Sequence, residues 1–202
     1  MYKTTDKIFF FKLKKDIKDN LILKKKLIKL KKKIGKAIKI IYFAISNKKK
    51  IFICGNGGSA GDAQHLASEF LVRIRPQINR KPIPIINLAL DNATFTASAN
   101  DYGYHQVFSK NLDAIGDYGD VLISLSTSGN SKNIIEVIKK ANQKNIYTIS
   151  LLGAGGGKSK KISKLSLIIP SRITARIQEA HIFLGHHILE CVEDLLLKFK
   201  KI

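Results

Sequence analysis

Two stretches of the chain place imidazoles and a carboxyl or amide group at helical spacing. His65 and Glu69 are four residues apart, so a helix would present both on one face. Near the C-terminus, Gln178 and His186 lie about 80° apart around a helix, while His187 lies about 180° from Gln178. His186, and not His187, can therefore share a site with Gln178. Taken alone, a His and a Glu at this spacing more often form a surface pair that stabilises the helix.

These side chains could bind a metal ion or move protons. His65, Glu69, Gln178 and His186 offer two imidazoles, one carboxylate and one amide oxygen, a set that suits four-coordinate zinc. A dry pocket raises the pKa of a carboxyl group toward neutral pH, the range in which histidine already titrates. His181 and Glu179 could support the site, and His187 is interpreted as a packing or capping residue.

Two loops that follow apolar runs contain the other unusual residues. The first, G-N-G-G-S at residues 55–59, follows I-F-I-C, and its glycines would let backbone amides approach a ligand closely. The second, S-T-S-G-N-S at residues 126–131, has four hydroxyls in six residues. Hydroxyls and free amides at the start of a helix can bind a phosphate dianion without a basic side chain. Capping explains one such hydroxyl, so four of them favour phosphate binding.

Short apolar runs alternate with helical patterns from residue 50 onward. Strands are expected at 51–54, 84–90, 120–125, 146–152 and 165–170, and helices at 59–72, 104–115, 131–144 and 175–199. Such alternation indicates a parallel sheet covered on both faces, with ligands at the carboxyl ends of the strands. We therefore predict an α/β fold with an open, parallel five-stranded sheet in three layers.

The composition argues against a nucleic-acid-binding protein and against a membrane-spanning one. The net charge is +21, but residues 1–50 contribute +15 of it, almost entirely through lysine. Isoleucine and lysine each occur 31 times, the joint excess that an AT-rich genome imposes. Nucleic-acid surfaces favour arginine and aromatic residues, so nucleic-acid binding is disfavoured despite the charge. No apolar run is long enough to cross a membrane. Cys54 and Cys191 are expected to be reduced thiols in a cytoplasmic protein.

The lysine-rich start of the chain is predicted to be helical. Apolar residues recur every three or four positions between residues 21 and 45, as on one face of a helix. That face favours packing on the body or on another subunit over lying on a membrane. Residues 1–20 are too irregular to assign. The predicted division is a helical segment at residues 1–49 and one domain at 50–202.

Four motifs together resemble the phosphoheptose isomerases, which have the flavodoxin-like sugar-isomerase (SIS) fold. They are C-G-N-G-G-S at 54–59, A-N-D-Y-G at 99–103, S-T-S-G-N-S at 126–131 and R-I-Q-E-x-H at 176–181. The resemblance covers residues 50–198. It implies that the serine loop holds a sugar phosphate and that Glu69 and His186 form an acid/base pair. The substrate-contacting positions it implies are Asn56, Gly57, Gly58, Glu69, Asn100, Asp101, Ser126, Thr127, Ser128, Ser131 and Gln178.

The resemblance also implies the reaction. It is the conversion of sedoheptulose 7-phosphate to D-glycero-D-manno-heptose 7-phosphate through an enediol, on the route to lipopolysaccharide heptose. Zinc, held by His65, Glu69, Gln178 and His186, and a homotetramer with sites at subunit boundaries are implied as well. Whether Glu69 or His186 takes the carbon-bound proton stays open, as does the role of the metal.

Two alternatives come from other classes of protein. A relative with the same loops binds the bacterial replication initiator without isomerase chemistry, and the presence of Glu69 and His186 favours the enzyme over it. A sugar sensor that binds nucleic acid would need a helix-turn-helix ahead of the sugar domain. The lysine-rich segment shows one long stripe instead.

Overall fold

A five-stranded parallel sheet organises the protein. In the computed structural model, which describes residues 2–202, the strands are ordered β2-β1-β3-β4-β5 and every pair is parallel. Their bounds are Ile51–Cys54, Ile85–Asn87, Val121–Ser126, Tyr147–Leu152 and Leu165–Ile168 for β1 to β5. The predicted α/β fold class is confirmed, and all five strands fall within or beside the predicted ranges.

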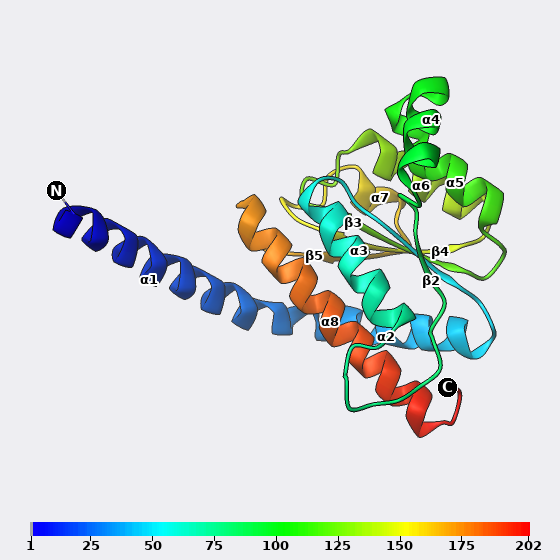
Figure 1. The fold of residues 1–202 in the computed structure, drawn as a ribbon, viewed down its shortest axis with the longest axis horizontal. Helices are drawn as coiled ribbons and strands as arrows, with labels where there is room; N and C mark the ends of the chain where they lie inside the picture. The colour runs from blue at the N-terminus through cyan, green and yellow to red at the C-terminus, as the bar shows by residue number, and fades with distance from the viewer. Residues whose placement is uncertain (1) are drawn as a thin grey trace.

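Helices cover both faces of the sheet (Figure 1). The α-helices are α1 Tyr2–Leu27, α2 Lys31–Ser46, α3 Gly58–Leu71, α4 Asn92–Tyr102, α5 Val107–Ile115, α6 Lys132–Gln143, α7 Ser159–Ile162 and α8 Thr174–Lys198. Two short 3-10 helices, η1 Ile28–Leu30 and η2 Tyr104–Gln106, complete the described chain. Two of the α-helices, α4 and α7, were not predicted.

Alternate residues of β1 enter different cores. Ile51 and Ile53 of β1 face the core formed with α2, α3 and α8, whereas Phe52 and Cys54 face the core formed with α5 and α6. This is the two-residue period of a strand buried on both sides. The carboxyl ends of β1 and β3 therefore emerge side by side between two helical layers. The glycine loop, residues 55–59, begins at the end of β1, and the serine loop, residues 126–131, begins at the end of β3.

The N-terminal segment is helical from Tyr2 to Ser46. Its second half packs on the body, because Leu23, Leu27, Ile34 and Ile41 are buried in the same core as the sheet. Its first half extends away from the body in Figure 1 and exposes Phe9, Phe10 and Phe11 among other apolar residues. The boundary predicted between residues 49 and 50 thus separates parts that share one core, and as a functional division it stays a proposal.

No helix among the described residues combines the length and the apolar character that crossing a membrane requires. Cys54 is buried and Cys191 is half-buried, and both are free thiols. Burial raises the pKa of each thiol above its ordinary value.

One buried histidine makes the stability of the fold depend on pH. His181 of α8 is fully buried, and its ring nitrogens have no hydrogen-bond partner of ordinary geometry among the described residues. Removal from water lowers the pKa of His181 from 6.5 to about 4, and the nearby Leu152 backbone opposes only part of this effect. The folded protein therefore holds this ring neutral.

We expect the free energy of unfolding to decrease as the pH falls from 6.5 toward 4, by up to about 3 kcal/mol from this residue. The unfolded chain takes up a proton over that range, whereas folded His181 does not. Denaturant titrations of wild type and His181→Leu at several pH values give the free energy of unfolding of each protein. The effect of His181 is the difference between the two slopes of that free energy against pH. Parallel pH profiles for the two proteins would contradict it.

Candidate active site

Helices α3 and α8 run side by side in the same direction and present the chemical groups to each other (Figure 1). Two glycines permit their close approach. A Cβ at Gly185 of α8 would lie 2.5 Å from Cδ1 of Leu66 on α3. At the start of α3, a Cβ at Gly58 would collide with the amide nitrogen of Gln178 from α8. A side chain at Gly185 would displace Leu66 or the helix that carries it, and one at Gly58 would displace Gln178.

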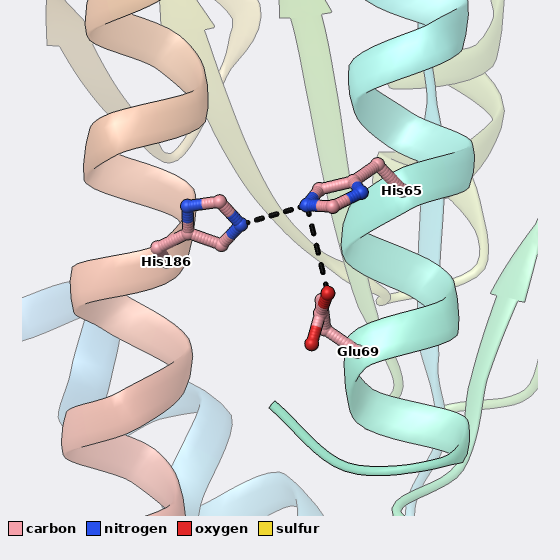
Figure 2. Close-up of side chains that lie close together, drawn as sticks. All are labelled: His65, Glu69 and His186. Atoms are coloured by element: carbon pink, nitrogen blue, oxygen red, sulfur yellow. Dashed lines mark hydrogen bonds and ion pairs between the residues drawn. The ribbon is translucent and has the colours of Figure 1, made fainter. Parts of the chain in front are cut away.

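Between these contacts, the side chains of His65, Glu69 and His186 converge, as Figure 2 shows. His65 Nε2 lies 2.9 Å from His186 Nε2 and 3.6 Å from Glu69 Oε1. One ligand atom from each residue lies within 4.8 Å of the others. His65 is exposed, while Glu69 and His186 are half-buried, so the cluster is open to solvent on one side. The predicted face shared by His65 and Glu69 therefore meets His186.

The cluster fits a divalent metal ion. Ligands of a tetrahedral zinc ion, at about 2.0–2.2 Å from the metal, lie roughly 3.3–3.6 Å from one another. The two distances at His65 bracket that range, and two imidazoles with one carboxylate form a usual catalytic zinc set. The carboxamide of Gln178 lies against Gly58. Since Gln178 and His186 are eight residues apart, their backbones are separated by about 12 Å along α8.

Asp62 is a further acid beside this cluster that the sequence did not single out. Its Oδ2 is buried and has no hydrogen-bond partner among the described residues. Burial raises the pKa of Asp62, and the nearby His65 and His186 partly offset this effect. Asp62 is one turn before His65 on α3, so it adds negative charge next to the imidazoles.

The glycine loop connects β1 to α3 through backbone conformations that only glycine adopts easily. Gly57 has φ 55° and ψ −123°, and it precedes the first residue of α3. A Cβ at Gly55 would collide with the backbone of Ser59. The amides of Ser59 and Ala60 donate to the carbonyls of Asn56 and Gly57 at 3.0 and 2.9 Å, and the positive end of the α3 dipole beside this loop favours an anion or a polar ligand.

The serine loop has a similar position after β3. Ser126 Oγ is buried and accepts a hydrogen bond from the Gly129 amide at 3.0 Å, so this hydroxyl shapes the loop. Ser128 Oγ is exposed and accepts from the Asn130 amide at 3.1 Å. Ser131 is the N-cap residue of α6, but its side chain makes no capping bond. Capping therefore does not account for this set of hydroxyls.

The glycine-rich loop after β4 supports the serine loop from behind. A Cβ at Gly129 would collide with the backbone of Gly156, and the amide of Ser159 donates to the Gly129 carbonyl at 2.9 Å. Lys158 donates its backbone amide to Asn130 Oδ1 at 3.0 Å. The run G-A-G-G-G-K at residues 153–158 is thus explained by the close approach of two loops.

A pair of asparagines joins the glycine loop to the serine loop, and only one of them was predicted. Asn56 and buried Asn133 exchange reciprocal side-chain hydrogen bonds of 2.9 and 2.8 Å, and Tyr104 Oη donates to Asn56 Oδ1 at 2.9 Å. Asn133 follows the serine loop at the start of α6. The available signal for Asn133 was an asparagine at the start of the helix predicted at residues 131–144. Tyr104 gave no such signal, although it begins the helix predicted at residues 104–115.

Other predicted residues lie outside these contacts. Asn100 and Asp101 are exposed at the end of α4, where Asn100 donates to Asp101 at 2.9 Å. Glu179 binds Arg176 and Asn20 of α1, and so it fixes α1 to α8. His187 is exposed, lies 3.9 Å from Cys191 Sγ through its Nε2 and lines an apolar groove with Phe183.

The fold and the two loops define a class of protein. A parallel sheet whose strands end in a glycine loop and a hydroxyl loop, with an imidazole and carboxylate cluster alongside, is the arrangement of a sugar-phosphate-binding domain. Residues 18–153 match the family model described as the SIS domain.

The particular family follows from relatives. The chain is 45% identical to the phosphoheptose isomerase of Helicobacter pylori strain P12 over 85% of this chain and 88% of the relative. It is 42% identical to that of Clostridium acetobutylicum over 89% and 92%. The phosphoheptose isomerase structure from Neisseria gonorrhoeae superposes with a TM-score of 0.84 at 37% identity, covering 91% of this chain and 97% of that one. The chain belongs to the phosphoheptose isomerase family.

We expect Zn²⁺ to bind the full-length protein at the cluster. His65→Gln or His186→Gln should weaken zinc binding by at least about tenfold, since the loss of a residue that contacts a metal only indirectly commonly lowers the affinity by that factor. Isothermal titration with Zn²⁺ measures the affinities. His187→Gln is the matched control, because this exposed histidine of α8 lies outside the cluster. Equal affinity in all four proteins would show that zinc binds elsewhere.

Proposed function

We propose that this protein converts sedoheptulose 7-phosphate to D-glycero-D-manno-heptose 7-phosphate, as a phosphoheptose isomerase. The observation that supports it most is the convergence of Glu69 and His186, with His65, from the two helices α3 and α8. A protein that only bound a sugar phosphate would need the two loops but not this cluster. Family membership agrees with the same activity.

The reaction moves one proton between neighbouring carbons. A base removes a proton from C1 of the ketose, and the electron pair forms the C1–C2 double bond of an enediol. Reprotonation at C2, with transfer of a proton from the C1 oxygen to the C2 oxygen, gives the aldose. Glu69 and His186 are the acid/base pair in this proposal, since they approach one another from separate helices and can address opposite ends of the enediol.

The serine loop binds the phosphate in this proposal. Thr127, Ser128 and Ser131 have hydroxyls at the start of α6, whose free amides and dipole favour a dianion. Asn56, Gly57 and Gly58 contact the sugar, Asn100 and Asp101 provide further contacts, and Gln178 reaches the substrate beside Gly58. The Asn56–Asn133 pair would then fix the distance between the phosphate end and the sugar end of the site.

Zinc is the proposed cofactor. His65, Glu69 and His186 would hold it, with Gln178 as the fourth ligand that the resemblance implies. A bound divalent ion would polarise the substrate carbonyl and stabilise the charge of the enediolate.

The proposal extends to the setting of the enzyme. Its product would supply heptose for lipopolysaccharide, and the free thiols Cys54 and Cys191 suit the reducing cytoplasm. A homotetramer is proposed as well, because α1 exposes Phe9, Phe10 and Phe11, and an apolar groove of about 810 Å³ lies between α1, η1, α2 and α8. The mass of the purified protein in solution decides the assembly.

We expect purified protein to form aldoheptose phosphate from sedoheptulose 7-phosphate, and Glu69→Gln and His186→Gln each to lower kcat by at least about a hundredfold. Each substitution removes a group that transfers protons while keeping its size. Glu190→Gln is the matched control, because Glu190 is exposed on α8 and lies outside the cluster. The assay follows product by chromatography, before and after chelation and zinc addition.

Full activity in both site variants would refute the acid/base assignment. Absence of turnover in zinc-loaded wild type, together with tight capture of a replication initiator protein, would favour the non-catalytic alternative.

A further inference from the structure

A buried ion pair closes the α3–α8 interface below the cluster. Arg80, in the loop between α3 and β2, and Glu193 of α8 both have side chains that are 1% exposed. Arg80 Nε donates to Glu193 Oε1 at 2.5 Å. Glu193 follows His186 by seven residues, or two helical turns, so both side chains lie on the same face of α8.

The same guanidinium binds the last turn of α3. Arg80 Nη2 donates to the Glu69 carbonyl and Nη1 to the Phe70 carbonyl, both at 3.0 Å. The last carbonyls of a helix lack partners within the helix, and the dipole makes this end negative, so a cation is favoured there. Arg80 thus caps the helix that carries His65 and Glu69, at the backbone of Glu69 itself.

Arg75 provides an internal comparison. It comes from the same loop and also binds Glu193, at 2.7 Å, and Asp194, at 2.6 Å. Its hydrogen bonds go to α8 alone, however, and it makes none to α3. Of these two arginines, Arg80 alone connects α8 to the end of α3.

We propose that Arg80, held by Glu193, is a positioning residue that sets the distance between α3 and α8 and thereby the approach of His65 and Glu69 to His186. A guanidinium is required because its planar fork supplies donors in three directions at once. A lysine keeps the charge but has a single nitrogen, so it can pair with Glu193 without holding both carbonyls of α3. The kinetic part of this inference rests on the proposed function, and the geometric part does not.

The test compares Arg80→Lys with Arg75→Gln and wild type, all as full-length chains. We expect Arg80→Lys to fold, by circular dichroism, and to lose at least about tenfold in kcat, because small misplacements of catalytic groups are costly. Its KM should stay within about twofold, since the serine loop does not contact Arg80. Arg75→Gln should have a lower melting temperature than wild type but an unchanged kcat.

Crystal structures of wild type and Arg80→Lys provide a readout without activity. The separation of His65 Nε2 and His186 Nε2, 2.9 Å here, should increase in Arg80→Lys.

If Arg80→Lys does not fold, Glu193→Gln tests the same link, because it keeps the Arg80 contacts to α3 but weakens the anchor on α8. An unchanged separation in the folded variant, or equal kcat losses in the Arg80 and Arg75 variants, would overturn the proposal. Failure of wild type to turn over substrate would refute the proposed function, and the structural comparison would still decide this inference.

Discussion

The close parallel packing of α3 on α8 is the contact on which the site depends. At Gly185 the two helices are near enough that a single methyl group would overlap Leu66. Across this contact, His65 Nε2 of α3 lies 2.9 Å from His186 Nε2 of α8. The contact is ordered along its length, with Gln178 against Gly58 at one end and the Arg80–Glu193 pair at the other. The cluster of His65, Glu69 and His186 therefore lies within an interface that is fixed at both ends.

The sheet positions the two loops proposed to bind the substrate. Adjacent strands β1 and β3 end at the same edge, so the glycine loop and the serine loop start as neighbours and need only the Asn56–Asn133 amide pair to fix their spacing. Neither loop contains an arginine or lysine side chain. Phosphate recognition would then come from hydroxyls, amides and helix dipoles, while the large positive charge of the chain stays on the N-terminal helices.

Sequence patterns predicted those parts of the molecule that local chemistry specifies. The five strands were found because each is a short, continuous apolar run, as the buried pattern of β1 and β3 shows. His65 and Glu69 were paired because four residues make one helical turn. Helix α4 was missed because Ser98 is its only buried residue, so it has no apolar stripe to detect. The helicity of residues 2–20 was missed for a related reason, since most of residues 6–20 are exposed.

The remaining features depend on contacts between distant residues. That α3 would meet α8 in parallel follows from Gly185, which resembles any helical glycine in the sequence, and from Arg80, which resembles any loop arginine. Their roles depend on partners 119 and 113 residues away along the chain, at Leu66 and Glu193. No local pattern encodes such a pairing, although each half of the cluster can be recognised alone.

The most direct measurement of this account is a double-mutant comparison of isomerase kcat across the helix contact, with Gly185→Ala, Leu66→Ala and the two combined. Alanine at 185 should force the helices apart and lower kcat, because its Cβ overlaps Leu66. Shortening Leu66 in the same protein removes the overlapping atoms, so the combined variant should recover most of the lost kcat. Full activity in Gly185→Ala, or a folded double variant no faster than Gly185→Ala alone, would contradict the claim that helix separation controls the site.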